Sequence, residues 1–455
     1  MFSSVIIKEM IYLDFSATTP LLPAVKKELL RIMELDLGNP SSLHSAGQTG
    51  KSLLNRARSE VAQLIEARPQ SVIFTSGGSE SNNTVIRTFE GCPIFVSAIE
   101  HPSVLHPAEA YGAPCTKIPV NQQGIIDINF LQTELEKTII KDPKQKILVS
   151  VMLANNETGT IEPVAEVAQL IQDLKKSTHT KIYLHTDATQ AVGKIPVSVK
   201  ALNCDYLTFT SHKLGGPVGI AALYIRPGSP FKPLIMGGAQ ENKRRAGTSN
   251  VLLASGFKVA AQEAKKNLNK YQEVAKLRDY LAKEIKKKIP SAKIITPIED
   301  KAIGPFELIK ENSRISGGDY ERARSMAGAT RSASRSARLV DDGNQTEFFQ
   351  ARKEPIVCLP NILNISFPAA EGESTQLYLD LENIEVSTGS ACASGDLEPS
   401  HVLMAMYHDA EIAHGSVRFS FGLTTTRAEI DELLAKLPPI IAKIQDLSTI
   451  KQGKS

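Results

Sequence analysis

Residues 181–217 read KIYLHTDATQAVGKIPVSVKALNCDYLTFTSHKLGGP and decide the fold class. They contain two runs of β-branched and aromatic residues, Lys181–Leu184 and Tyr206–Phe209, and the stretch between the runs is long enough for one crossover connection. Short buried strands joined by crossovers are typical of a parallel sheet. We therefore expect an α/β protein in which these two strands belong to one mostly parallel sheet.

Polar residues follow both predicted strands. Asp187 and Gln190 come after the first strand, and Ser211, His212 and Lys213 come after the second. Because open α/β sheets bind ligands beyond the carboxyl ends of their strands, we expect the acid and the lysine to face one crevice. Pyridoxal phosphate (PLP) suits such a crevice, since a carboxylate can hold its ring nitrogen protonated and an amine can form a Schiff base with its aldehyde. A helix-capping Asp and a solvated Lys would explain the same residues, so the rest of the chain has to decide.

Length and composition narrow the classes of protein. The chain has 455 residues, of which 42% are hydrophobic and 22% charged, and this favours a globular protein with two lobes. A formal net charge of +3 is too small to indicate binding to nucleic acid or an acidic membrane. We find no secretory signal and no apolar stretch of transmembrane length, and expect a soluble, cytoplasmic protein. The five cysteines show no C-x-x-C spacing, which argues against a disulfide framework and against a metal site.

A turn rich in glycine and hydroxyl residues follows the predicted strand Ser71–Phe74. It reads TSGGSESNN over residues 75–83 and precedes a predicted helix, so backbone N–H groups would converge there on an anion such as phosphate. The turn matches neither a Walker motif nor G-x-G-x-x-G, which argues against nucleoside triphosphates and dinucleotides. An ordinary helix start capped by Ser79 is the alternative.

Two further strand ends carry candidate residues. The strand Pro93–Ser97 is followed by His101, whose imidazole could stack on a flat cofactor and move protons near neutral pH. The strand Lys146–Met152 is followed by the pair that includes Asn156, and its amides suit a carboxylate or a ring hydroxyl. A structural histidine and turn-forming asparagines are the alternatives.

The second half of the chain contains a predicted lobe boundary and an insertion. Region Leu252–Ile289 has helical i, i+3, i+4 apolar spacing, and we place the boundary within it. Residues 304–355 include the run RARSMAGATRSASRSARLVDDGNQ, which offers little apolar material to bury. We interpret them as a mobile, low-complexity insertion.

Cys392 and Arg418 are the remaining candidates. Small residues surround Cys392 in STGSACASG, and they would leave its thiol accessible on a loop that can move. A buried structural cysteine would normally have apolar neighbours. Arg418 falls inside the predicted strand SVRFS, which is an unusual place for a charge unless it pairs with an anion.

Together these stretches resemble the cysteine desulfurases, which are PLP enzymes of aminotransferase class V and fold type I. The resemblance rests on YLDFSATTP, FTSGGSESNN, EHPSV, NNETG, HTDATQAVGK, FTSHKLGGPVG, RRAGTSN, STGSACASGDLEPSHVL and SVRFSFG, in the family order. It implies a large PLP-binding domain, residues 11–262, with a mostly parallel seven-stranded sheet. It also implies a smaller α+β domain, residues 263–455 together with the N-terminal residues. Residues 304–355 depart from the family pattern, and we expect the site to tolerate such an insertion.

The resemblance implies a role for each residue of the PLP site. Lys213 would form the Schiff base, and Asp187 would pair with the ring nitrogen. Gln190 would bond the ring hydroxyl, while His101 would stack on the ring and shuttle protons. The remaining cofactor contacts would come from Gly78, Ser79, Asn156, Ser211 and His212 of one subunit and Thr248 of the other. Such a shared site implies a homodimer.

The resemblance also implies the reaction. Asn156 and Arg418 would hold the carboxylate of L-cysteine, and Cys392 would attack its sulfur to give L-alanine and a persulfide. The persulfide would pass to acceptor proteins such as an iron–sulfur scaffold, with Cys392 as a transient cluster ligand, although tRNA thiolation and cofactor synthesis stay open as destinations. The alternatives are a related PLP-dependent lyase, such as selenocysteine lyase, and a non-catalytic scaffold, against which Lys213 and Cys392 argue.

Overall fold

The computed structural model of the chain describes residues 10–298, 358–389 and 398–448. The predicted insertion, residues 304–355, and the predicted nucleophile Cys392 lie outside the described residues. Across the described ranges, no helix combines the length and the apolar character that a membrane span requires.

The large lobe is built on a seven-stranded sheet. Its strands are β2 (Val72–Thr75), β3 (Ile94–Ser97), β4 (Cys115–Ile118), β5 (Lys146–Ser150), β6 (Lys181–Asp187), β7 (Tyr206–Thr210) and β8 (Ala221–Ile225). They lie in the order β2-β8-β7-β6-β5-β3-β4, in which β8 is antiparallel to both neighbours and the other pairs are parallel. The predicted α/β fold with a mostly parallel seven-stranded sheet is confirmed.

The two strands that decided the fold class are parallel neighbours, with Asp187 opposite Thr208. β6 extends beyond the predicted end at Leu184, because its polar residues continue the ladder with β7. The prediction stopped too early since it relied on apolar residues, whereas pairing inside a sheet keeps polar residues extended as well. Asp187 is consequently the last residue of the strand.

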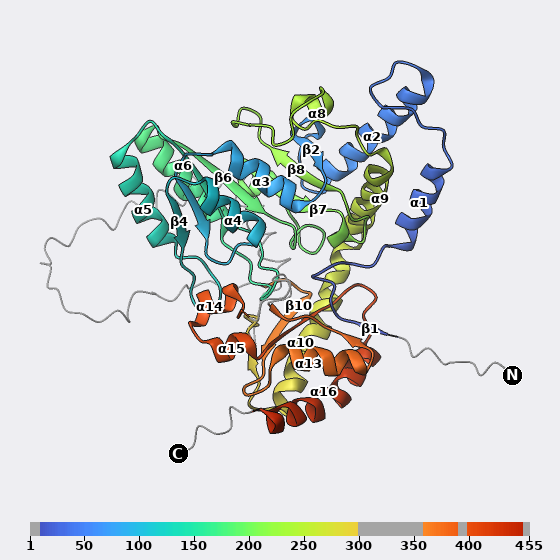
Figure 1. The fold of residues 1–455 in the computed structure, drawn as a ribbon, viewed down its shortest axis with the longest axis vertical. Helices are drawn as coiled ribbons and strands as arrows, with labels where there is room; N and C mark the ends of the chain where they lie inside the picture. The colour runs from blue at the N-terminus through green and yellow to red at the C-terminus, as the bar shows by residue number, and fades with distance from the viewer. Residues whose placement is uncertain (1–9, 299–357, 390–397, 449–455) are drawn as a thin grey trace, which may run out of the picture.

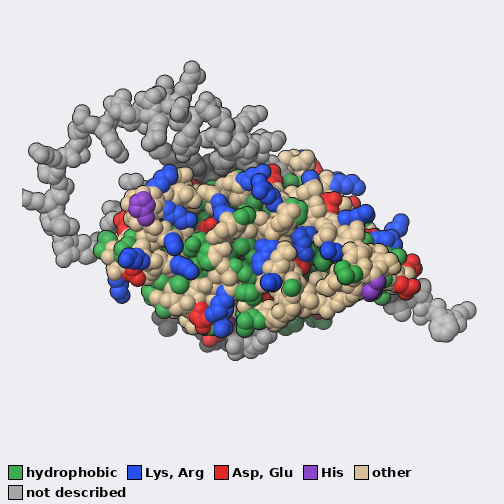
Figure 2. Space-filling view, turned by 90° about the horizontal axis from the view of Figure 1, so that it is seen from above, with side chains coloured by type: hydrophobic (Ala, Val, Ile, Leu, Met, Phe, Trp, Pro, Cys, Tyr) green, Lys and Arg blue, Asp and Glu red, His purple; other side chains and the backbone are tan. Residues whose placement is uncertain are grey.

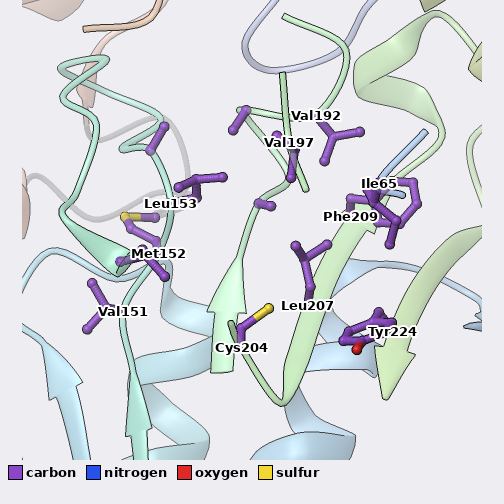
Figure 3. Packing of buried hydrophobic residues seen from close by; sticks show 14 of the residues in the cluster. Ile65, Val151, Met152, Leu153, Val192, Val197, Cys204, Leu207, Phe209 and Tyr224 are labelled. Carbon is purple, nitrogen blue, oxygen red and sulfur yellow. The ribbon is translucent and has the colours of Figure 1, made fainter. Parts of the chain in front are cut away.

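Helices cover both faces of this sheet (Figure 1). On one face lie α2 (Ser45–Gln63), α5 (Ile128–Lys141), α6 (Val164–Thr178) and α9 (Val251–Asn267), and on the other lie α3 (Gly78–Thr88) and α4 (Pro102–Tyr111). α1 (Pro23–Met33) packs on α9. Figure 3 shows part of the core that the sheet forms with α2, α5, α6 and α9, where Leu207 and Phe209 of β7 are buried with Ile65, Val192 and Val197. The core therefore holds β6 and β7 rigidly behind the predicted crevice.

A smaller lobe has a core of its own, which includes Ile11 and Leu13 from the start of the chain. Its three-stranded sheet consists of β9 (Lys293–Ile294), β10 (Ile362–Ser366) and β12 (Ser416–Ser420), and β1 (Ile11–Tyr12) pairs with β11 (Ile384–Glu385). Its helices are α10 (Tyr271–Lys288), α13 (Gly372–Leu381) and α16 (Arg427–Leu447), while α14 (His401–Tyr407) and α15 (Ala410–His414) bury apolar residues in the core of the large lobe. The expected strand position of Arg418 is confirmed, while the domain limits 11–262 and 263–455 stay a prediction.

Candidate active site

Asp187 ends β6 as a buried carboxylate that is held from both sides. The backbone N–H of Thr189 donates to its Oδ1 at 2.9 Å, and Nδ2 of Asn82 donates to its Oδ2 at 2.8 Å. Only 7% of Asp187 is exposed. The two donated hydrogen bonds fix the orientation of the Asp187 carboxyl group at the end of β6.

His101 is linked to Asp187 through two polar side chains. Its Nδ1 accepts from the backbone N–H of Ser103 at 3.1 Å, so the neutral ring carries its proton on Nε2. The Ser103 hydroxyl lies 2.8 Å from the same Nδ1 and accepts from Asn82 Nδ2 at 2.9 Å. Burial lowers the pKa of His101, as does the charge of Lys213, and the charge of Asp187 opposes this. The charges of Asp187 and Lys213 thus both influence this imidazole.

Lys213 follows β7 and is held by the start of the chain. Its Nζ donates to the carbonyl oxygens of Ser16 at 2.5 Å and Ala17 at 2.6 Å. Nε2 of Gln190 donates to the same Ser16 carbonyl at 3.0 Å. The predicted amine and the predicted amide therefore meet at one acceptor, the carbonyl oxygen of Ser16.

The turn over residues 75–83, where we expect the phosphate, leads into the start of α3. α3 begins at Gly78 after an N-cap residue, Gly77, that makes no side-chain cap, so the alternative of a helix start capped by Ser79 is excluded. Ser79 is instead the second residue of the helix, in its uncapped first turn. Such a helix start favours an anion, since its first N–H groups have no partner within the helix.

Buried hydroxyl and amide atoms complete a cradle for PLP. Within the described residues, hydrogen-bond partners are lacking for Ser211 Oγ, Thr210 Oγ1, Thr189 Oγ1 and Gln190 Oε1. Buried polar atoms normally have partners, so a ligand that supplies them fits here. His212 contributes Nδ1, which lies 3.2 Å from Thr18 Oγ1, and burial together with nearby lysines lowers its pKa to about 4. The residues present therefore fit a phosphorylated aromatic cofactor.

Arg418 is buried on β12, with 4% of the residue exposed. Its Nη2 donates to Asp14 Oδ1 at 2.9 Å, and its Nη1 donates to the carbonyl oxygen of Asn156 at 3.0 Å. Its Nε is buried and has no partner among the described residues. The structure thus brings Arg418 and Asn156 together as predicted, and adds Asp14, which the sequence prediction did not include.

Two predicted site residues are not joined to this cluster. Thr248 is exposed and lines a hollow of about 260 Å³ with Thr75 and Ser76, and no hydrogen bond within the described ranges connects it to Asp187 or Lys213. Cys392 lies outside the described residues. Its nearest described flanks, Gly389 and Glu398, begin and end the gap.

Sequence reasoning missed five residues of the site, namely Asn82, Ser103, Ser16, Lys194 and Asp14. Asn82 lies one helical turn after Gly78, and this spacing could have placed it on the same face of α3. Lys194 is 1% exposed, and its Nζ lies 3.4 Å from the carbonyl oxygen of Lys213. Burial, with a smaller effect of Lys213, lowers the pKa of Lys194 to about 7. The sequence around Lys194 has no spacing pattern that would have predicted a buried lysine.

Comparisons with known proteins agree with this geometry. The family model for aminotransferase class-V matches residues 11–309 and 321–433. The chain is 38% identical to cysteine desulfurase IscS of Dictyoglomus turgidum, with 98% of each chain covered, and 36% identical to that of Clostridium botulinum strain Hall, with 97% of this chain and 96% of the relative covered. Among solved structures it is similar to a NifS-like protein, at a TM-score of 0.75 and 30% identity, with 96% of this chain and 100% of that chain covered.

Proposed function

Since the chain belongs to the aminotransferase class-V family and is a PLP-dependent cysteine desulfurase within it, we propose how its own residues divide the reaction. The assignment rests on a chain of hydrogen bonds that runs from His101 through Ser103 and Asn82 to Asp187. Lys213 acts electrostatically on the same imidazole. An acid, a base and an amine in one crevice are what PLP chemistry requires of a protein.

The cofactor would be held at its aldehyde, its ring and its phosphate. When bound, PLP supplies an aldehyde and an electron-withdrawing ring that weakens the bonds at the α-carbon of an amino acid. Lys213 would bond the aldehyde, and Asp187 would hold the ring nitrogen protonated. Gln190 has a free Oε1 for the ring hydroxyl, and Ser211 has a free hydroxyl for the phosphate at the start of α3. Gly78, Ser79, His212 and the partner subunit's Thr248 would complete the phosphate site.

Protons would move at two atoms. Nε2 of His101 carries the proton of the neutral ring, because Nδ1 accepts from the Ser103 backbone. A lowered pKa keeps this imidazole neutral and able to donate and reaccept a proton near neutral pH. Nζ of Lys213 would take the proton from the substrate α-carbon and return it.

The substrate would bind by its carboxylate and react by its sulfur. Arg418 has an unpartnered Nε, and Asn156 lies beside it, so the pair would hold the carboxylate of L-cysteine. The Cys392 thiolate would attack the substrate sulfur. The carbon–sulfur bond breaks, a sulfur–sulfur bond forms, and a proton replaces sulfur on the β-carbon, which leaves L-alanine and a Cys392 persulfide.

A homodimer would bring the partner subunit's Thr248 to the phosphate. Figure 2 supports an interface on the upper face of the large lobe, where hydrophobic side chains gather in the middle with lysines and arginines around them. Met236, which precedes α8 (Gln240–Lys243), is 84% exposed.

Sulfur acceptors such as an iron–sulfur scaffold would then take the persulfide sulfur. The cytoplasmic compartment stays a prediction.

One assay tests the assignment. The chain with PLP and a thiol reductant is given L-cysteine, and alanine and sulfide are measured together with the visible band of the cofactor. We expect equal amounts of alanine and sulfide, loss of the band in Lys213→Ala, and loss of both products in Cys392→Ala. Full alanine release by Cys392→Ala would instead assign the chain to the lyases.

A further inference from the structure

Glu157 is a buried carboxyl group that the proposed reaction does not use. It follows Asn156 and is 3% exposed. Its backbone is fixed from two sides, because Asn155 Oδ1 accepts from its N–H at 2.8 Å and Asn364 Nδ2 donates to its carbonyl oxygen at 3.3 Å. Burial of an acid that contacts no ion-pair partner among the described residues is costly, so the position calls for a functional explanation.

The Glu157 carboxyl lies between Gly389 and Ser400. The Ser400 hydroxyl donates to Oε2 at 2.5 Å, and this hydroxyl also caps α14 by accepting from Leu403 N–H at 3.2 Å. A Cβ on Gly389 would overlap the same Oε2 and would lie 3.1 Å from Ser400 Cβ. Gly389 has no left-handed backbone, so a side chain there is opposed by contact with Glu157 and Ser400 rather than by backbone strain.

These contacts connect Glu157 to Arg418, the residue that we assign to the substrate carboxylate. Arg418 exchanges backbone hydrogen bonds with Ser387, at 2.7 and 3.2 Å, and its Nη1 donates to Asn156. Asn156 continues into Glu157, which meets Gly389, two residues after Ser387. The carboxylate-binding pair and the residues on both sides of the Cys392 segment are thus joined through one side chain.

We propose that Glu157 is a positioning residue for sulfur transfer, which ties Gly389 and Ser400 to the turn that carries Asn156. The inference rests on the proposed function, since it assumes that Cys392 takes the sulfur. Burial raises the pKa of Glu157 to about 7, against the Ser400 hydrogen bond and the charge of Arg418. A neutral glutamine therefore mimics one natural state of the group, and it keeps an oxygen that accepts from Ser400.

The test compares Glu157→Ala with Glu157→Gln in the full chain loaded with PLP. In Glu157→Ala we expect kcat for alanine release to fall at least about 10-fold, while KM for L-cysteine and the cofactor band change less than about 2-fold. Glu157→Gln is expected to restore kcat to within about 3-fold of the original. The matched control is Glu162→Ala, which removes an equally buried carboxyl, bonded to Ile126 N–H at 3.1 Å, and should leave kcat unchanged.

Gly389→Ala keeps the inference testable if Glu157→Ala folds poorly, and a double-mutant cycle of the two changes tests their coupling where both variants fold. Gly389→Ala alone should lower kcat, because its methyl group displaces the carboxyl, and it should cost much less in the Glu157→Ala chain, where the space is free. Additive effects, or an unchanged kcat in Glu157→Ala, would overturn the inference alone. A native chain that releases no alanine from cysteine would overturn the proposed function and this inference with it.

Discussion

Arg418→Met replaces a buried guanidinium by an apolar side chain of similar length. The change removes the Nη2 bond to Asp14 and the Nη1 bond to the Asn156 carbonyl. It also removes the unpartnered Nε that we assign to the substrate carboxylate. The variant therefore affects both the stability of the fold and the affinity for cysteine, and the two effects have to be separated.

The structure sets the size of each effect. Removing one partner of a buried ion pair costs about 3–5 kcal/mol, and because the Asp14 side chain is 21% exposed we expect about 2–3 kcal/mol of lost stability. A hydrogen bond to a charged group contributes roughly 1.5–3 kcal/mol, so loss of the carboxylate contact should raise KM for L-cysteine by about 10- to 100-fold.

Asp14→Asn is the matched control, since it breaks the same ion pair and leaves the guanidinium in place. Urea unfolding should show a comparable loss of stability in both variants. Steady-state alanine release should show the large rise in KM only in Arg418→Met. If Asp14→Asn raises KM as much as Arg418→Met does, the assignment of Arg418 to the substrate carboxylate is wrong.

Three further predictions concern the crevice. Lys194→Met should raise the free energy of unfolding more at pH 6.5 than at pH 9.5, by up to about 3 kcal/mol. Because the pKa of Lys194 is lowered on folding, the unfolded chain binds a proton between pH 7 and 10.5 that the folded chain lacks. Urea unfolding of the native chain should therefore show stability rising with pH over this window. Gly216→Ala should weaken PLP binding, measured by the visible band, because its Cβ would overlap Ser211 Oγ. Asp187→Asn should shift the cofactor band and lower kcat at least about 100-fold, since a neutral amide cannot hold a ring nitrogen protonated; an unchanged kcat would contradict its role.

The sheet was predictable because its strands are apolar runs that end at polar residues. Parallel pairing of β6 and β7 followed from the crossover between them. The antiparallel direction of β8 was not predictable, because it depends on a turn whose geometry the residues after Lys213 do not reveal. The helical region Leu252–Ile289 likewise divides into α9 and α10 at a short 3-10 turn, Leu268–Lys270, without a Gly or Pro to mark it.

The strand-end residues of the site were predictable, but their partners were not. Asn82 and Asp187 are 105 residues apart, and Asp14 and Arg418 are 404 apart. Contacts at such separations depend on how elements pack, and no local spacing encodes them. The backbone carbonyl of Ser16 that holds Lys213 has no sequence signal at all, because every residue carries a carbonyl group.

The central claim is that sulfur leaves cysteine by transfer to Cys392. The most direct measurement is mass spectrometry of the PLP-loaded chain after a single turnover with isotopically labelled L-cysteine, alongside Cys392→Ser. We predict one labelled sulfur on the peptide that contains Cys392, an equal amount of alanine, and neither product in the variant. Labelled sulfur on another cysteine, or alanine release by Cys392→Ser at the native rate, would contradict the account.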